Sequence, residues 1–347
     1  MIVRPKLNVI IPLYNAEKYI EKCLLSIVNQ TYENINVIVI DDGSTDRSVD
    51  IVEKIAKRNE KVQLLRQANS GVSKARNMGL SIVKSGEYVT FIDSDDYMDE
   101  DSYRILMERM VRENAQGVIF PFCRELADKK EITLLPWNDG TVLDNIRIQS
   151  ELIPKMIAEV VGKDTISGSV CRSIFLYDVI EHINFCENIN IQEDLIFCIE
   201  AYSKLKNILV DNNVVYHYVK HGVTTTEKYR AKFLQESLDL EEWIVESLKK
   251  ATVFDKVTEQ YWNKRITMYS LCISNLFRYD APYEAKYEID GIIESFAKDP
   301  YIGKKIYWKY FERRMILPYI LLKIKAKFLL SALYSRKEKI RQKKLSL

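Results

Sequence analysis

Apolar segments rich in β-branched residues alternate with helix-like segments through the first hundred residues. The predicted strands are residues 7–13, 35–40, 62–65 and 88–92. Between them, apolar residues recur three and four positions apart in residues 15–30, 51–55 and 72–84, which is helical spacing. Strands that are apolar along their whole length are typical of a parallel sheet covered by helices on both faces. The alternation therefore predicts an α/β fold with a mainly parallel sheet.

Three of the predicted strands are each followed by a polar cluster. Residues 12–15 (Pro-Leu-Tyr-Asn) follow the first strand, residues 41–46 (Asp-Asp-Gly-Ser-Thr-Asp) the second, and residues 93–96 (Asp-Ser-Asp-Asp) the fourth. Ligands of open α/β sheets bind at the carboxyl ends of the strands. All three clusters are therefore expected at one edge of the sheet, as parts of a single site.

Asp93, Asp95 and Asp96 place three carboxylates within four residues. Carboxylates this close repel one another unless a cation or hydrogen bonds offset the repulsion. The cluster is either a solvated turn or a site for a hard, oxygen-loving metal ion, and its position at the sheet edge favours the site. We expect Asp96 to be a solvated or helix-capping group and not a ligand.

The turn after the first strand contains no glycine. A dinucleotide-binding turn would show G-x-G-x-x-G and a P-loop would show G-x-x-x-x-G-K-[ST], and neither pattern is present. If a nucleotide binds here, its phosphates are not held mainly by a glycine-rich loop. A metal ion on Asp95 could take that role instead.

Five segments of the chain resemble the inverting, nucleotide-sugar-dependent glycosyltransferases of family 2, which have the GT-A fold. The segments are residues 9–15, 41–46, 69–77, 91–96 and 192–194. They occur in the family's order and spacing, and the resemblance covers residues 5–220. It implies a GT-A-like mixed, mainly parallel sheet flanked by helices, to which this chain adds a C-terminal helical region.

The resemblance also implies a donor-binding site. Its expected members are Pro12, Tyr14, Asn15, Asp42, Arg76 and Asp93. Tyr14 would stack on the nucleotide base, and Asp42 would accept a hydrogen bond from the ring N–H of the base. Arg76 would hold the aspartates and the diphosphate, while Asp93 would face the ribose and the donor sugar. The alternatives are that Tyr14 packs in the core and that Arg76 lies on a solvated helix face.

Asp95 resembles the ligand of Mg²⁺ or Mn²⁺, and Asp194 resembles the catalytic base. Glycosyl transfer leaves charge on the departing phosphate, which a divalent cation offsets. One carboxylate that takes the proton of the acceptor hydroxyl is enough for a single, inverting displacement. We expect Glu193 to orient the acceptor. The alternative is that both acids only occupy the first turn of a helix.

His217 lies in a predicted strand at residues 214–219 and is one of three histidines in the chain. His217 or His221 is a candidate for contacting the diphosphate or completing the metal shell. A histidine between two tyrosines is more often structural, so this alternative stays open.

The cysteines and the apolar segments indicate the cellular compartment of the protein. Six scattered cysteines without a C-x-x-C pair argue for a reducing compartment and against a disulfide framework or a zinc site. No signal peptide is visible, and no run of 18 uncharged apolar residues is long enough to span a membrane. We therefore expect a cytoplasmic protein.

The final segment differs in charge from the rest of the chain. Residues 303–347 contain 14 Lys and Arg against two Glu, a local net charge of +12. Because the whole chain carries +2, the preceding 302 residues carry −10. Aromatic residues are interleaved with these basic ones, which favours peripheral contact with the anionic inner face of the cell membrane. The alternative is a basic helix with solvated lysines, and no motif supports nucleic-acid binding.

We therefore predict three parts: a GT-A glycosyltransferase domain (1–225), a helical extension (226–302) and a basic amphipathic tail (303–347). The predicted activity is metal-dependent, inverting transfer from a nucleotide-sugar, with a UDP-sugar favoured, to a saccharide acceptor in surface-polysaccharide synthesis, plausibly a lipid-linked one. One alternative is a sugar nucleotidyltransferase, which would require a glycine-rich loop after the first strand. Another is a non-catalytic nucleotide-sugar-binding or scaffold module.

Overall fold

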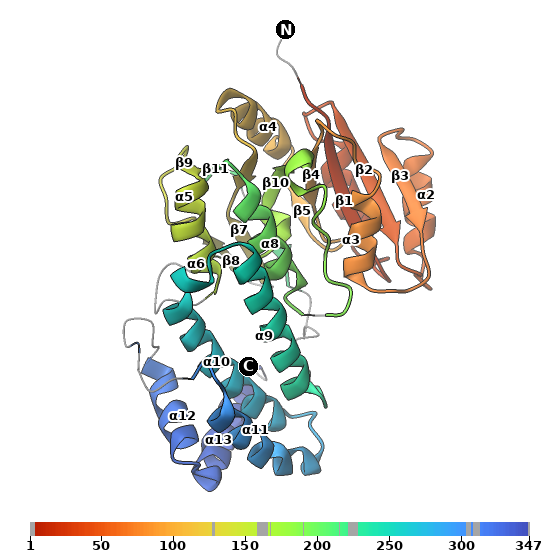
Figure 1. Ribbon diagram of the computed structural model, residues 1–347. Coiled ribbons are helices and arrows are strands. Elements are labelled where there is room, and N and C mark those ends of the chain that lie inside the picture. Colours follow the sequence, from red (N-terminus) through yellow and green to blue (C-terminus); the bar gives the residue numbers. More distant parts are fainter. Residues whose placement is uncertain are drawn as a thin grey trace. The chain divides into compact units, whose positions relative to one another are not determined.

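The computed structural model describes residues 4–126, 129–157, 166, 168–189, 191–214, 216–220, 228–302, 307 and 313–345. The chain divides into two compact units (Figure 1). The first unit comprises residues 1–153 and 166–221, and the second comprises residues 154–165 and 222–347. Each unit has its own hydrophobic core.

The main sheet of the first unit has the order β3-β2-β1-β4-β10-β6-β11-β9 among the described residues. Its strands are β1 (Leu7–Leu13), β2 (Ile35–Asp41), β3 (Val62–Arg66), β4 (Tyr88–Phe91), β6 (Gly117–Ile119), β9 (Val142–Asp144), β10 (Ser173–Leu176) and β11 (Asn207–Val210). β1, β2, β3 and β4 pair in parallel, whereas β10 lies antiparallel between β4 and β6. The predicted mixed, mainly parallel sheet is confirmed.

Helices connect and cover these strands (Figure 1). Those of the first unit are α1 (Ile20–Val28), α2 (Ser48–Ala56), α3 (Val72–Leu80), α4 (Ser102–Arg112), α5 (Asn145–Arg147), α7 (Tyr177–Ile180) and α8 (Glu193–Lys204). All of α6 (Ile153–Ile157) except its first residue belongs to the second unit. A π-helical turn (Ile148–Leu152) joins α5 to α6, and a 3-10 turn (Val170–Arg172) precedes β10. Gly79 lets α3 approach β1 closely, because a Cβ at this position would lie 2.6 Å from Ile10 Cγ2.

A second sheet has the order β5-β12-β7-β8, where β5 is Tyr97–Met98, β7 is Phe122–Leu126, β8 is Lys129–Thr133 and β12 is Tyr216–Val219. The sequence suggests a hairpin over residues 131–143, and this prediction is wrong. β8 pairs with β7, and β9 pairs with β11. The turn at Asn138 does form, since Thr141 N donates to Asn138 O at 3.1 Å. A local turn signal does not determine which strands its flanks will pair with.

The second unit is helical in its described residues. Its helices are α9 (Phe233–Lys250), α10 (Thr258–Leu276), α11 (Ile289–Lys298), α12 (Arg313–Lys323) and α13 (Lys327–Leu345), with 3-10 turns at Phe254–Lys256 and Tyr283–Glu288. Trp262, Tyr269, Leu322 and Tyr334 are among the side chains of its core. No helix in the described ranges is long and apolar enough to cross a bilayer.

Candidate active site

The β1–α1 and β2–α2 loops lie side by side at the carboxyl edge of the main sheet, because the last residues of β1 and β2 are paired in register. Asn15 N donates to Ser44 Oγ at 3.1 Å, and Thr45 N donates to Asn15 Oδ1 at 2.8 Å. β4 runs parallel to β1, so Asp93 follows at the same edge. The structure confirms that the three polar clusters share this edge.

Tyr14 and Asn15 face solvent at this edge, and Pro12 is partly buried beside them. Tyr14 is 52% exposed, which excludes the alternative that it packs in the core. Asn15 has φ 47°, a left-handed conformation that asparagine tolerates better than most residues. The helix predicted over residues 15–30 forms, but it is shorter than its spacing indicates. α1 begins at Ile20, because the Asn15 side chain is engaged with the neighbouring loop.

Asp42 is buried and connects β2 to the loop before α3. Its Oδ1 accepts from Gln67 Nε2 at 2.7 Å and from Ser70 N at 2.8 Å, while Oδ2 accepts from Gly71 N at 2.8 Å. Gly71 has φ 93°, which favours glycine at this position. Asp41 Oδ1 accepts from Ser44 N at 3.0 Å and so orients its own loop. These three hydrogen bonds fix the Asp42 carboxylate in place.

Arg76 joins motifs that are far apart in the sequence. Its Nη1 donates to Asp194 Oδ1 at 2.6 Å and Glu193 Oε1 at 3.1 Å, and its Nη2 donates to Asp93 Oδ1 at 3.0 Å. Arg76 is only 3% exposed, which excludes the solvated-face alternative. Burial acts to lower the pKa of Arg76, but the carboxylates, Asp194 most of all, raise it well above its usual value. Arg76 therefore stays charged.

Asp194 lies in the first turn of α8 and is held at both oxygens. Oδ1 accepts from Arg76, and Oδ2 accepts from Val170 N at 3.2 Å. Burial raises the pKa of Asp194, Arg76 lowers it, and the charges of Glu193 and Asp93 raise it again, to about 7. A carboxylate with this pKa can take up a proton near neutral pH, as a general base must. Glu193 shares the first turn, so the helix-terminus interpretation also applies.

The three aspartates after β4 differ in their surroundings. Asp93 N donates to Tyr216 Oη at 3.1 Å, and Tyr216 Oη donates to Asp96 Oδ2 at 2.6 Å. Val219 N donates to Asp96 Oδ1 at 2.9 Å. The prediction that Asp96 is solvated or a helix cap is wrong, because β12 packs over it and leaves it 1% exposed. Burial, then the charges of Asp93 and Asp95, raise the pKa of Asp96 to about 8.

The carboxylates after β4 offer oxygen atoms of the kind that a divalent cation prefers. The repulsion expected from the sequence is present, since the charges of Asp93 and Asp95 both act to raise the pKa of Asp96. Asp95 and Asp93 are only partly buried, so their oxygens are accessible to a ligand. Carboxylate oxygens are the donors that Mg²⁺ and Mn²⁺ prefer.

His217 lies in β12, opposite Tyr97 of β5. Its ring stacks on Tyr97 with centroids 4.3 Å apart, and its Nδ1 lies 3.1 Å from Glu125 Oε1. Its Nε2 is 3.1 Å from Asp99 Oδ2, without hydrogen-bond geometry. Cys123, Glu125 and His217 also bring one donor atom each within 4.8 Å of one another. The second candidate histidine, His221, lies outside the described residues.

Glu125 is already engaged in that cluster. It pairs with Lys130 and accepts from Tyr97 Oη at 2.6 Å. Burial acts to raise its pKa, but hydrogen bonds from Lys130, Tyr97 and His217 lower it to about 2. The surroundings of His217 among the described residues are therefore those of a structural histidine.

Two contributors were not predicted from the sequence. They are Tyr216, which contacts Asp96, and Val170, which contacts Asp194. Both act through contacts to residues more than 20 positions away, Asp96 and Asp194. No local pattern signals such contacts.

Comparison with known proteins decides the family. Residues 8–181, half of the chain, match the family model described as glycosyl transferase family 2. The chain belongs to this family.

Curated relatives are also glycosyltransferases by name. "Glycosyltransferase GlyA" of Streptococcus pneumoniae is 44% identical over 115 residues, 33% of this chain and 16% of that protein. "Uncharacterized glycosyltransferase EpsJ" of Bacillus subtilis is 29% identical over 227 residues, 64% of this chain and 63% of that protein. "Poly(ribitol-phosphate) beta-N-acetylglucosaminyltransferase TarS" of Staphylococcus aureus is 33% identical over 228 residues, 61% of this chain and 35% of that protein. The chain thus spans less than two thirds of each of these relatives.

Solved structures support the fold. The crystal structure of S. aureus TarS 1-349 in complex with UDP-GlcNAc has a TM-score of 0.68 and 20% identity, and the match covers 97% of this chain and 92% of that one. The GT-A-like fold expected from the sequence is confirmed.

Proposed function

We propose that this protein is a glycosyltransferase that moves a sugar, with inversion, from a nucleoside diphosphate sugar to a saccharide acceptor. The observation that supports this most is the contact of Arg76 with Asp93, Glu193 and Asp194. It joins the expected donor side to the expected base. A UDP-sugar is the favoured donor, because the similar TarS structure holds UDP-GlcNAc.

The donor nucleotide would lie over the loops after β1 and β2. Tyr14 offers an exposed ring for stacking on the base, with Pro12 and Asn15 beside it. Asp42 offers its remaining acceptor site to the ring N–H, and its three hydrogen bonds hold it in position without rearrangement. Asp93 would face the ribose and the donor sugar.

Mn²⁺ or Mg²⁺ would be held by Asp95, with Asp93 close by, and would offset the charge that develops on the departing diphosphate. His217 is a weaker candidate ligand, because both of its ring nitrogens already face carboxylates. Arg76 adds a fixed positive charge beside Asp93.

Asp194 would act as the base. Its carboxylate takes the proton from the acceptor hydroxyl as the hydroxyl oxygen attacks the anomeric carbon, and the bond to the diphosphate breaks on the opposite face. Arg76 and Val170 N fix the direction of the carboxylate. Glu193, in the same helical turn, would orient the acceptor.

The two rivals predict different results. A sugar nucleotidyltransferase would form a nucleotide-sugar from a nucleotide and a sugar phosphate, and a non-catalytic module would only bind one. The test is to incubate the protein with a panel of nucleotide-sugars and Mn²⁺ and to measure nucleoside diphosphate release. NMR of the released sugar then gives its anomeric configuration, and retention would contradict the inverting mechanism.

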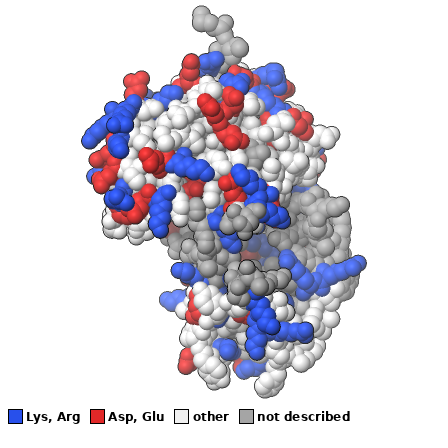
Figure 2. All heavy atoms as spheres, turned by 180° about the vertical axis from the view of Figure 1, so that it is seen from behind, with Lys and Arg blue, Asp and Glu red and all other residues white. Residues whose placement is uncertain are grey.

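We also propose peripheral membrane contact through the C-terminal helices, with residues 1–225 as catalytic domain, 226–302 as helical extension and 303–347 as tail. The α12–α13 corner, residues 317–329, exposes five large apolar side chains: Leu317, Ile320, Ile324, Phe328 and Leu329. Lys323 and Lys325 are exposed among them, and Figure 2 shows Lys and Arg spread over the helical unit. Apolar side chains among lysines suit an anionic bilayer surface. A lipid-linked acceptor and a position at the inner face of the cell membrane would follow.

A further inference from the structure

Three arginines are buried in the described part of the chain, Arg76, Arg172 and Arg265. Arg76 contacts three carboxylates, and Arg265 pairs with Asp299. Arg172 is also only 3% exposed, yet no carboxylate of the described residues lies within ion-pair distance of it. This makes Arg172 the exception among the buried arginines.

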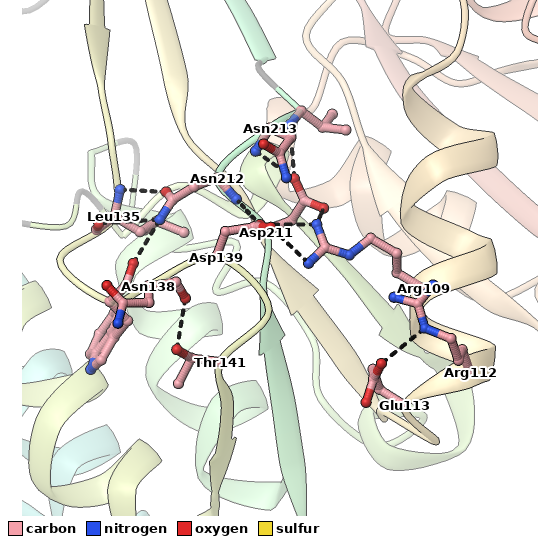
Figure 3. A network of polar contacts seen from close by, with 12 residues as sticks. Arg109, Arg112, Glu113, Leu135, Asn138, Asp139, Thr141, Asp211, Asn212 and Asn213 are labelled. Carbon is pink, nitrogen blue, oxygen red and sulfur yellow. Dashed lines mark hydrogen bonds and ion pairs between the residues drawn. The ribbon is translucent and has the colours of Figure 1, made fainter.

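Arg109 of α4 shows how this fold satisfies such a side chain elsewhere (Figure 3). Its guanidinium pairs with Asp139 and with Asp211, which is fully buried. Asn212 N donates to Asp139 Oδ1 at 2.9 Å, and Asn213 N donates to Asp211 Oδ1 at 2.8 Å. Every charge in this network has a partner, which is the usual condition of a charge taken out of water.

Two contacts to the Arg172 guanidinium come from the described residues. Nε donates to Phe120 O at 3.0 Å, and the Phe122 ring lies 4.7 Å from the guanidinium carbon. Nη1 and Nη2 donate to no described residue. Burial lowers the pKa of Arg172 to about 10, with no carboxylate acting against it.

Arg172 lies at the ligand edge of the sheet. It ends the 3-10 turn before β10, and β10 runs antiparallel between β4 and β6. The start of β10 therefore lies beside the carboxyl ends of β4 and β6, next to the loop that carries Asp93. The same 3-10 turn begins with Val170, whose N–H donates to Asp194.

The position of β10 separates Arg172 from the nucleotide side. The expected base pocket belongs to β1 and β2, and the strand order along the edge is β2-β1-β4-β10. Arg172 thus lies beyond β4, on the side of Val170 and the base Asp194. This is the side from which an acceptor hydroxyl must approach.

We propose that Arg172 binds an oxyanion, a phosphate or carboxylate group, carried by the acceptor saccharide. A planar guanidinium with two free N–H edges suits bidentate contact with either group. An anion at this point would supply the counter-charge that the protein lacks. The inference rests on the proposed function, because it assumes that the acceptor lies on the Asp194 side.

The test uses the full chain saturated with UDP and Mg²⁺, so that the diphosphate site is filled. Inorganic phosphate is then added at constant ionic strength, and the melting temperature is followed for wild type, Arg172→Met, Arg172→Lys and Arg109→Met. We expect phosphate to raise the wild-type melting temperature, to raise it less in Arg172→Lys and to have no effect in Arg172→Met. Arg109→Met, if folded, should keep the wild-type response.

Stability without ligand gives a second readout. Removing an uncompensated buried charge should leave Arg172→Met as stable as wild type or more stable, whereas Arg109→Met leaves Asp211 unpaired and should melt at a lower temperature. If Arg172→Met does not fold, Arg172→Gln replaces it in the phosphate titration.

Three results would overturn the inference: no phosphate response in wild type, an equal response in the Arg172 variants, or loss of UDP affinity together with phosphate affinity. The last would assign Arg172 to the donor diphosphate. Failure of the wild type to bind any nucleotide-sugar would instead contradict the proposed function. The melting temperatures of wild type and Arg172→Met with phosphate, measured without UDP, would still show whether Arg172 binds an oxyanion.

Discussion

Arg76 Nη1 and Asp194 Oδ1 lie 2.6 Å apart, although 118 positions separate the two residues in the chain. The same guanidinium holds Asp93 and Glu193. The buried guanidinium of Arg76 therefore sets the distance between the carboxylates at the end of β4 and those at the start of α8. The account of the site depends on this arrangement.

Replacing Arg76 by Met should destabilise the first unit strongly. Asp93, Glu193 and Asp194 would then face one another without a counter-charge, and breaking a buried ion pair on one side costs about 3–5 kcal/mol. Thermal melts measure the effect. Arg66→Met is the matched control, because the pair of Arg66 with Glu53 is exposed and should be worth about 1 kcal/mol or less. Equal losses in both variants would contradict the central role of Arg76.

Asp96 should make stability depend on pH. Its pKa is raised in the folded protein, so its contribution to stability is fully present below about pH 4 and is lost as the pH rises towards 8. The difference between this pKa and the ordinary value of an aspartate corresponds to at most about 6 kcal/mol. Melts in EDTA between pH 5 and pH 8.5 should show wild-type stability falling relative to Asp96→Asn, which cannot ionise. A constant difference between the two proteins across this range would argue against a protonated Asp96.

A divalent cation should stabilise the protein through Asp95. Mn²⁺ at 100 times its dissociation constant would add about 2.7 kcal/mol, and the melting temperature should rise accordingly. Asp95→Asn should lose most of this increase, whereas Asp50→Asn, at an exposed position on α2, should keep it. An unchanged Mn²⁺ response in Asp95→Asn would exclude Asp95 as the ligand.

The α12–α13 corner should bind anionic vesicles. Phe328 is 87% exposed, and burying an aromatic side chain is worth about 1.5–3 kcal/mol, so Phe328→Asp should weaken binding about tenfold or more. Co-sedimentation with phosphatidylglycerol vesicles measures this. Ile146→Asp, at another exposed apolar position, should bind like wild type. Similar binding by both variants would leave the corner without a role at membranes.

The sheet and the shared edge of the site could be predicted because parallel strands bring their carboxyl ends together. Polar residues such as Tyr14, Asp42 and Asp93 therefore had to be neighbours once the strands were identified. Contacts that depend on later strands could not be predicted: Asp96 is buried only because β12 packs over it. The lack of a carboxylate beside Arg172 among the described residues could likewise be seen only in the folded structure.

Helix ends and strand partners were also beyond the sequence pattern. Asn15 is a good N-cap residue, but tertiary hydrogen bonds to Ser44 and Thr45 hold it outside α1. The turn at Asn138 forms as its sequence indicates, yet β9 pairs with β11 and not with β8. Local sequence propensity does not decide the structure where residues distant in the sequence form the hydrogen bonds of these side chains and strands.

The most direct test of the account is the pH dependence of donor hydrolysis in wild type and in Asp194→Asn, with Mn²⁺ and the donor found in the screen. Because the pKa of Asp194 is raised to about 7, the wild-type rate should increase as the pH rises through 7. Asp194→Asn should bind the donor with similar affinity but turn it over about 10²–10⁴ times more slowly, without this pH dependence. Glu200→Gln, on the same helix, should behave like wild type. Equal turnover in wild type and Asp194→Asn would contradict the assignment of Asp194 as the base.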